Sequence, residues 1–289
     1  MSKIHDGIMG LVVGDALGVP YEFKARGSFY AEDMVGYGTH NQPPGTWSDD
    51  SSMTLATLKS LVDCHGIDLN DIMKNFKRWL FTGAFTPWKH TFDVGNTTRR
   101  AIDRYKHGVS VYGCGGAMWK DNGNGALMRI LPLAFADAGD KEIDAVSGLT
   151  HNHEISKAGC RLYVEIARQI MKGESLEWIL EYGLGSMPAE YVRIPSLKYV
   201  LEDDIRSSGY VVDTLEAALW CLLHSGSYKN AVLMAVNLGN DTDTVAAVTG
   251  GLAGLMYGVG EKKGGIPEEW IKQIPRRTWI KKLCTMFEK

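Results

Sequence analysis

The chain has 289 residues, with 31 Lys and Arg against 34 Asp and Glu, which gives a formal net charge of −3. This near-neutral balance provides neither the basic stripe that drives nucleic-acid binding through counterion release nor a polybasic surface for membranes. A composition of 45% hydrophobic and 22% charged residues is typical of a globular chain, and it excludes the disordered, collagen-like and disulfide-scaffold classes.

The N-terminal segment is unsuited to secretion, because it carries one Lys and then places Asp6 and Asp15 among its apolar residues. The longest stretch of low charge, residues 244–260, has 17 residues with five Gly and falls short of a membrane span. Five Cys residues without a C-x-x-C pair argue against disulfides and zinc ribbons. We therefore expect a monomeric protein of the reducing cytoplasm that contacts no membrane.

Apolar residues at helical spacing predict most of the elements. Three helical faces are, in chain order, Leu55, Leu58, Leu61 and Val62; Leu162, Ile166 and Ile170; and Leu215, Leu219, Leu222 and Leu223. The first helix should end at Gly66, the second should follow Glu154, and the third should begin near Asp213.

A further helix should run to Gly108 from an N-cap within Asn96–Thr98. From Glu261 the chain is rich in Lys and Arg, which predicts a solvent-exposed helix at the C-terminus. Period-2 strands are absent, since residues 209–212 are too short to count. Without a linker or low-complexity tract, we predict an all-α fold of many helices in one compact domain, residues 1–289.

Many of the 33 glycines lie inside apolar helical stretches rather than in loops. Gly250, Gly254 and Gly258 recur every four residues, and residues 7, 10, 14 and 18 of the first segment are also Gly. Glycine weakens a helix by about 1 kcal/mol relative to Ala. Its repeated use predicts helices whose backbones approach closely.

Two short acidic segments each stand directly before an apolar helix: Trp47–Ser52, with the sequence WSDDSS, and Gly239–Thr244, with the sequence GNDTDT. Capping explains one acid per helix, because it satisfies free N–H groups and complements the helix dipole. Two neighbouring acids repel each other unless a positive charge lies between them. Carboxylates with hydroxyls, and no nearby His or Cys, favour hard cations such as Mg²⁺, Mn²⁺ or Ca²⁺. Capping and metal binding both stay open at this point.

Two glycine-rich stretches, residues 113–117 and 122–129, lie between the acidic segments. Neither has the G-x-G-x-x-G or G-x-x-x-x-G-K-[ST] pattern, so dinucleotide-binding and P-loop sites are rejected. Gly123–Gly125 could still expose backbone N–H groups to a phosphate, although an ordinary turn explains the same residues.

With these residues in view, the chain resembles the ADP-ribosylglycohydrolase family over nearly its whole length. The motifs that carry the resemblance occur in the family's order: Gly14–Gly18 with Glu22 and Phe23, Trp47–Ser51 with Met53 and Thr54, Asp93–Arg99, Gly123–Arg129, Thr150 with His151, Gly209–Leu215, and Gly239–Thr244. Ser48 and Ser51 stand where Thr is usual, which keeps the ligand oxygen, and Asn240 stands where Gly is usual.

The resemblance implies an all-α fold with two divalent cations, Mg²⁺ or Mn²⁺, and hydrolysis of the glycosidic bond between ADP-ribose and an acceptor. The ligands that it implies are Ser48, Asp49, Asp50, Asp241, Asp243 and Thr244. Metals would hold the distal ribose and activate water at the anomeric carbon, and carboxylates including Asp50 would stabilise an oxocarbenium-like transition state. The matching general base is Glu22. Asp93 either shares its work or caps the following helix.

The resemblance also implies a pocket for the rest of ADP-ribose. Asn124 and Gly125 match the loop near the pyrophosphate, and His151 matches a residue that hydrogen-bonds ribose or phosphate. Tyr210 matches an aromatic side chain that can stack on adenine. Without the resemblance, Tyr210 would be assigned to the core and His151 to a polar helix start.

Three functions are considered. We favour an enzyme that removes ADP-ribose from modified protein, with arginine as the acceptor because the similarity leans toward the nitrogenase-regulating branch. Serine-linked, nucleic-acid-linked or O-acetyl-linked ADP-ribose are alternatives, although the charge balance disfavours nucleic acid. A crystallin-like or ADP-ribose-binding protein without activity is the second function, and intact carboxylates argue against it. A metal-dependent phosphohydrolase, which would release AMP, is the third.

Overall fold

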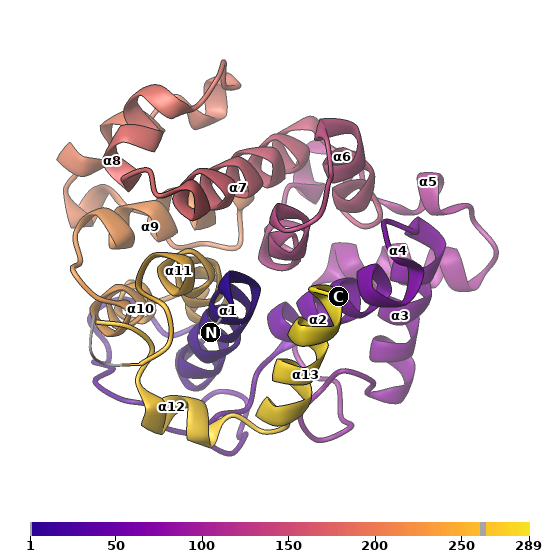
Figure 1. Cartoon of the computed structure of the whole chain (residues 1–289), viewed down its shortest axis with the longest axis horizontal. Helices are drawn as coiled ribbons and strands as arrows, with labels where there is room; N and C mark the ends of the chain where they lie inside the picture. Colours follow the sequence, from indigo (N-terminus) through magenta and orange to yellow (C-terminus); the bar gives the residue numbers. More distant parts are fainter. Residues whose placement is uncertain (1, 261–263) are drawn as a thin grey trace.

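The computed structural model describes residues 2–260 and 264–289, and in this part of the chain the regular structure is helical (Figure 1). The α-helices are α1 Lys3–Gly18, α2 Asp49–Cys64, α3 Leu69–Thr82, α4 Asn96–Lys106, α5 Val111–Cys114, α6 Asp140–Gly148, α7 Glu154–Lys172, α8 Leu176–Trp178, α9 Val211–Leu223, α10 Tyr228–Asn237, α11 Thr242–Tyr257, α12 Glu268–Gln273 and α13 Arg277–Phe287. The described residues form isolated β-bridges but no strand. The predicted all-α class is confirmed.

Helices α1 and α11 lie side by side at the centre of the molecule, although they come from opposite ends of the chain (Figure 1). Every residue of α1 from Ile4 to Gly18 is buried, as is α11 from Thr242 to Leu255. A Cβ atom on Gly14 would lie 2.1 Å from the carbonyl oxygen of Ala246. A Cβ atom on Gly250 would lie 2.3 Å from the carbonyl oxygen of Gly10. Only glycine allows backbones to approach so closely, and the predicted close approach is confirmed at these two positions. Gly258 instead ends α11 with a φ of 72°, and Gly7 faces side chains rather than backbone.

The other predicted helices exist, with small differences at their ends. Helix α9 begins at Val211 rather than near Asp213, and Leu215, Leu219 and Leu222 are buried along it. Helix α4 begins as expected at Asn96, but its N-cap is Gly95 and no side chain caps it, so the prediction of an Asn or Thr cap is wrong.

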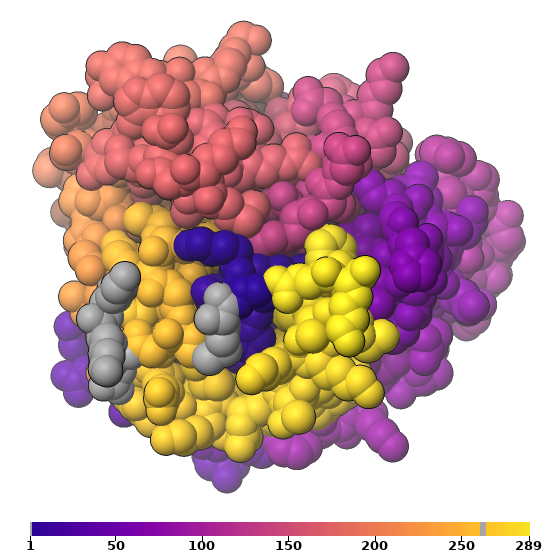
Figure 2. All heavy atoms as spheres, in the orientation of Figure 1, coloured from indigo at the N-terminus to yellow at the C-terminus, as the bar shows by residue number. Residues whose placement is uncertain are grey.

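The expectation of one solvent-exposed helix at the C-terminus is also wrong. Residues 261–263 lie outside the described part, and the rest of the segment forms α12 and α13. Trp270, Ile280 and Leu283 are buried, whereas the Lys side chains between them point to solvent. Helix α13 packs on α2 and α1, and it lies beside the N-terminal segment on the surface in Figure 2. Its amphipathic pattern explains both its charge and its burial.

Candidate metal centre and active site

The two predicted acidic segments meet in space, although they are far apart in the sequence. Ser48 is the N-cap of α2, and Asp241 is the N-cap of α11. Helix α1 packs on both helices and brings Asp15 between them. Carboxylate oxygens of Asp15, Asp50 and Asp243 all lie within 4.8 Å of one another. The helix ends therefore gather three buried carboxylates at one point.

A second group of carboxylates adjoins the first. Oxygens of Glu22, Asp241 and Asp243 also lie within 4.8 Å of one another, so Asp243 belongs to both groups. Glu22 comes from the loop after α1, where Phe23 N–H donates to the carbonyl oxygen of Asn240 at 2.6 Å. This hydrogen bond ties the loop to the segment before α11. The two groups thus form a continuous cluster of five acids, which we call the acidic cluster: Asp15, Glu22, Asp50, Asp241 and Asp243.

Helix capping does not explain this cluster. Ser48 accepts a hydrogen bond from the Asp50 N–H at 3.4 Å and acts as the cap of α2. Asp241 makes no such bond to α11, and its Oδ2 instead accepts from the Asn124 side-chain amide at 2.9 Å. Asp243 lies inside the helix and is completely buried. Ser48 thus caps α2, and neither Asp50 nor Asp241 is needed as a helix cap. The buried acids must therefore have a role other than capping.

Asp15 is the member of the cluster that the sequence analysis did not assign. It accepts from the backbone N–H groups of Ser48 at 2.9 Å and Ser51 at 3.0 Å, and from the Ser51 hydroxyl at 2.5 Å. These bonds fix the first turn of α2 against α1. A carboxylate within the otherwise apolar segment Gly14–Gly18 was the available signal.

The acidic cluster is electrostatically costly without a bound cation. Burial raises the pKa of Asp15 to about 6 and that of Glu22 to about 7, and it raises the pKa values of Asp50 and Asp243 well above their ordinary range. Neighbouring carboxylates raise the last two further. Within the described residues, Asp50 Oδ1 and Asp243 Oδ2 are buried without a hydrogen-bond partner. Such oxygen-only groups fit Mg²⁺ or Mn²⁺ and do not suit zinc.

These shifts predict how the metal-free protein responds to pH. The folded chain holds its protons on Asp15 and Glu22 more tightly than the unfolded chain does, so the free energy of unfolding falls as pH rises from about 4 to about 7. Asp15 alone contributes a loss on the order of 3 kcal/mol. Thermal unfolding in chelator at pH 4 and pH 7.5 measures the effect. A stability that stays constant or rises over this interval would contradict it.

A cavity of about 340 Å³ lies over the acidic cluster. The predicted site residues that line it are Glu22, Asp49, Asp93, Asn124, Gly125, His151, Asp241 and Thr244. Ser48, Asp50 and Asp243 are buried and do not line it. The structure thus brings the predicted residues together at one place, with the acids at its base.

The glycine loop forms one wall of this cavity. The Asn124 N–H donates to the carbonyl oxygen of Gly209 at 3.0 Å, and Val211 N–H donates to that of Asn122 at 3.0 Å. A Cβ atom on Gly125 would lie 2.8 Å from Cε1 of His151, so the loop rests on this imidazole. Burial lowers the pKa of His151 to about 3, which keeps the ring neutral at neutral pH. The wall therefore presents backbone and imidazole groups without positive charge.

Tyr210 is the one predicted site residue that lies apart from the cavity and from the acids beneath it. Its backbone pairs with Gly123, and its ring is half-buried beside Trp119, with the ring centroids 6.4 Å apart. Trp119 is 65% exposed and also contacts His153 edge-on at 6.0 Å. Two aromatic rings therefore flank the glycine loop, and the sequence analysis found only one of them.

His40 is a second residue that the sequence analysis missed. Its Nε2 forms a hydrogen bond with Oε2 of Glu22, and its ring lies 5.2 Å from that of Phe92. Ring and carboxylate atoms of Glu22, His40 and Asp93 lie within 4.8 Å of one another. Asp93 has a φ of 48°, a left-handed conformation that costs free energy outside glycine. Glu22 and Asp93 line the cavity, and His40 contacts both of them.

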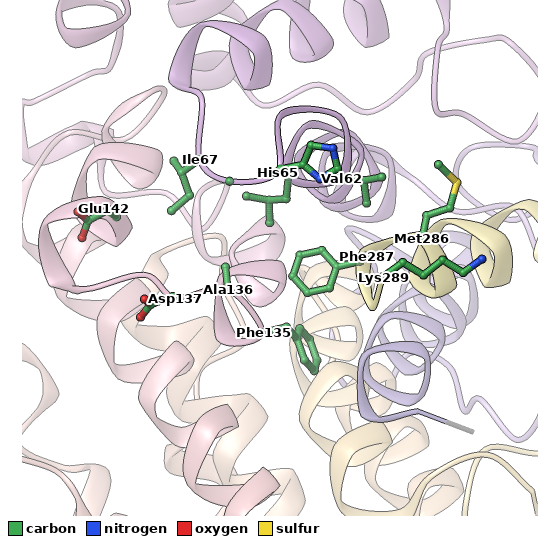
Figure 3. Close-up of a pocket in the computed structure, with 12 residues that line it drawn as sticks. Val62, His65, Ile67, Phe135, Ala136, Asp137, Glu142, Met286, Phe287 and Lys289 are labelled. Atoms are coloured by element: carbon green, nitrogen blue, oxygen red, sulfur yellow. The ribbon is translucent and has the colours of Figure 1, made fainter.

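A larger cavity, of about 640 Å³, lies at the end of α13, with lining side chains from α2, α6 and the loop before α6 (Figure 3). Its lining is largely apolar and includes Val62, Phe135 and Phe287. It contains none of the predicted site residues. The smaller cavity over the acidic cluster, which we call the acidic cavity, contains the residues to which the sequence assigns chemistry.

Comparison with known proteins agrees with this geometry. A family model described as ADP-ribosylglycohydrolase matches residues 1–289. ADP-ribosylarginine hydrolase Tri1 of Serratia proteamaculans (strain 568) is 34% identical over 297 residues, covering 98% of this chain and 78% of that protein. ADP-ribosyl-(dinitrogen reductase) glycohydrolase of Rhodospirillum rubrum is 33% identical over 289 residues, covering 94% of this chain and 91% of that protein.

A solved structure described as "ADP-ribosylglycohydrolase-related protein complex" superposes with a TM-score of 0.84 at 30% sequence identity. The superposition covers 99% of this chain and 96% of that one. In the described residues, no helix is long and apolar enough to cross a membrane. The chain belongs to the ADP-ribosylglycohydrolase family.

Proposed function

We propose that this chain hydrolyses the glycosidic bond between ADP-ribose and an arginine side chain of a modified protein, with the help of two divalent cations. The observation that carries the proposal is the acidic cluster, whose two carboxylate groups share Asp243 at the base of a cavity. Support for arginine comes from two relatives named ADP-ribosylarginine hydrolase, which are 34% and 33% identical to this chain.

The residues that would hold the cations are Asp15, Asp50, Asp241 and Asp243 of the acidic cluster, together with Ser48, Asp49 and Thr244. Asp15, Asp50 and Asp243 form one group, and Glu22, Asp241 and Asp243 form the other. Asp49 and Thr244 face the cavity, where they can reach a substrate hydroxyl as well as an ion. Bound Mg²⁺ or Mn²⁺ supplies positive charge that orients the ribose hydroxyls and acidifies water.

Glu22 is the proposed general base. Burial raises its pKa to about 7 in the chain without bound cations, and Glu22 lines the cavity in which substrate and water would meet. The hydrogen bond from His40 holds one carboxylate oxygen and leaves the other free to accept a proton from water. Asp50 and Asp93 are proposed to stabilise positive charge that develops on the ribose ring during bond cleavage.

The glycine loop is proposed to bind the remainder of ADP-ribose. Asn124 is held by its side-chain bonds to Asp241 and to the Thr214 hydroxyl, both at 2.9 Å, so its position does not depend on substrate. The neutral His151 can hydrogen-bond a ribose hydroxyl or a phosphate oxygen. Tyr210 and Trp119 offer aromatic faces for the adenine ring at low entropic cost.

Product analysis tests the proposed reaction. The protein is incubated with Mg²⁺ or Mn²⁺ and ADP-ribosyl-arginine, and the products are identified by mass spectrometry. Free ADP-ribose with arginine is the expected result. Release of AMP would replace the proposal by a phosphohydrolase, and tight binding without turnover of any acceptor would replace it by a binding protein.

The acceptor is tested separately with serine-linked, O-acetyl-linked and nucleic-acid-linked ADP-ribose at equal concentration. We expect the highest kcat/KM for the arginine linkage. The net charge of −3 gives no attraction for a nucleic-acid acceptor. Faster cleavage of a serine or ester linkage would keep the glycohydrolase and overturn its assignment to arginine.

A further inference from the structure

A third cavity, of about 600 Å³, lies between α2, the end of α3 and the beginning of α13. It shares no lining residue with the acidic cavity. Its charged lining residues are all cations: Lys59, Arg78, Lys89 and Arg276. Phe85 and Trp279 supply its aromatic surface. We call it the basic cavity.

Three of the four cations lack a carboxylate partner. Lys59 pairs with Asp63 on the same helix. Among the described residues, Arg78, Lys89 and Arg276 have no carboxylate oxygen within the 4.0 Å of an ion pair. Like charges gathered in one concave surface repel one another, and a bound anion would remove that cost. The basic cavity is thus the electrostatic opposite of the acidic one.

The two guanidinium groups are already held in place. Arg276 lies 4.2 Å over the ring of Trp279, and Arg78 lies 5.7 Å from the ring centre of Phe85. Each uses one N–H donor within the protein: Arg276 to the Thr86 carbonyl oxygen at 2.8 Å, and Arg78 to Asn75 Oδ1 at 3.2 Å. A guanidinium has five N–H donors, so most of them are left for a ligand. Contact with an aromatic ring already restricts each Arg side chain, so less side-chain entropy is lost when a ligand binds.

The loop that forms the floor of the basic cavity is also fixed. The carbonyl oxygen of Phe85 accepts from the Trp47 indole N–H at 3.2 Å, and the Thr86 hydroxyl donates to the Gly83 carbonyl oxygen at 2.7 Å. Trp47 directly precedes Ser48, the cap of α2 at the acidic cluster. A cavity with a preformed floor binds with little conformational cost.

We propose that the basic cavity binds a phosphate-bearing small molecule of nucleotide size, at a site separate from the active site. Arginine forks match phosphate oxygens in pairs, and a lysine adds a point charge. The volume lies within the usual range for small-molecule sites, and the rings supply apolar contact for a base or sugar. The proposal does not depend on the reaction assigned to the acidic cavity.

Calorimetric titration with pyrophosphate and with ADP tests the proposal, with the divalent cations removed. The diagnostic variant is Arg78→Gln with Lys89→Gln. The matched control is Lys272→Gln with Lys281→Gln, which removes two exposed charges that do not line the cavity. Thermal unfolding confirms that both variants fold. We expect binding to the wild type, a loss of about 100-fold in affinity in the diagnostic variant, and a change of less than about threefold in the control.

The two probes separate the sources of the phosphate. Tighter binding of ADP than of pyrophosphate, lost in the diagnostic variant, supports a nucleotide at the basic cavity. Equal binding of the two probes, also lost in that variant, supports a ligand recognised through phosphate alone. The proposal would be overturned if neither pyrophosphate nor ADP bound to the wild type at about 1 mM. Equal weakening in both variants, which indicates unspecific attraction, would also overturn it, as would undiminished binding in the diagnostic variant, which places the anion elsewhere.

Discussion

Replacing both Asp241 and Asp243 by Asn lowers kcat/KM by at least about 10³-fold, and in chelator it raises the melting temperature. Activity falls because Asp243 belongs to both carboxylate groups and Asp241 to one of them, so neither cation keeps its ligands. Stability rises because a buried carboxylate that other acids surround is replaced by a neutral amide of the same shape. A variant that loses activity while its melting temperature rises has lost its metal ligands rather than its fold.

The measurements are turnover of ADP-ribosyl-arginine and thermal unfolding with and without Mn²⁺. The wild type should be stabilised by Mn²⁺, and the double variant should not. A matched control replaces Asp203 and Asp204, two exposed acids in a short turn, by Asn, and it should leave both readouts unchanged. Full activity of the Asp241–Asp243 variant in excess chelator would disprove the metal centre.

Replacing Glu22 by Gln lowers kcat by about 10²- to 10⁴-fold, the usual contribution of a general base, and changes KM little. Gln keeps the shape of the side chain and a carbonyl oxygen for the hydrogen bond with His40, but it cannot accept a proton from water. Stabilisation by Mn²⁺ should persist, because the other carboxylates of the acidic cluster are intact.

Steady-state kinetics together with thermal unfolding of the Glu22→Gln variant distinguishes two roles. Low kcat with retained stabilisation by Mn²⁺ supports a general base. Loss of stabilisation by Mn²⁺ would make Glu22 chiefly a metal ligand, and unchanged kcat would remove it from the mechanism.

The helical fold was predictable because its signals are local. The face Leu55, Leu58, Leu61 and Val62 is buried along α2, as its spacing required. The glycines of α1 and α11 predicted close packing of helices, but their spacing did not indicate which helix would be the partner. The cap of α4 and the burial of α13 were missed, since both depend on neighbours that a local pattern does not contain.

The acidic segments were predictable for a different reason. Two adjacent acids before an apolar helix conflict with local rules, and such conflicts mark functional sites. Asn240, which departs from the family's usual Gly, takes a φ of 61°, and Asn tolerates this left-handed conformation better than other side chains. The turn before Asp241 therefore accommodates Asn240.

His40, Asp15 and Trp119 show what the sequence leaves hidden. His40 reaches Glu22 from the irregular segment between η1 (Val19–Tyr21) and α2, where no periodicity places a side chain. Asp15 is recognisable only as a polar residue in a buried helix. Trp119 lies in η2, a three-residue turn (Trp119–Asp121), and approaches Tyr210 through long-range pairing of two loops. Each contact depends on tertiary structure alone.

Anomalous diffraction from a crystal grown with Mn²⁺ tests the central claim most directly, because it locates the ions without reference to activity. We predict two peaks at the base of the acidic cavity, one within ligand distance of Asp50 and Asp243 and the other within ligand distance of Asp241 and Asp243. A map of active protein with no peak at these carboxylates would contradict the account.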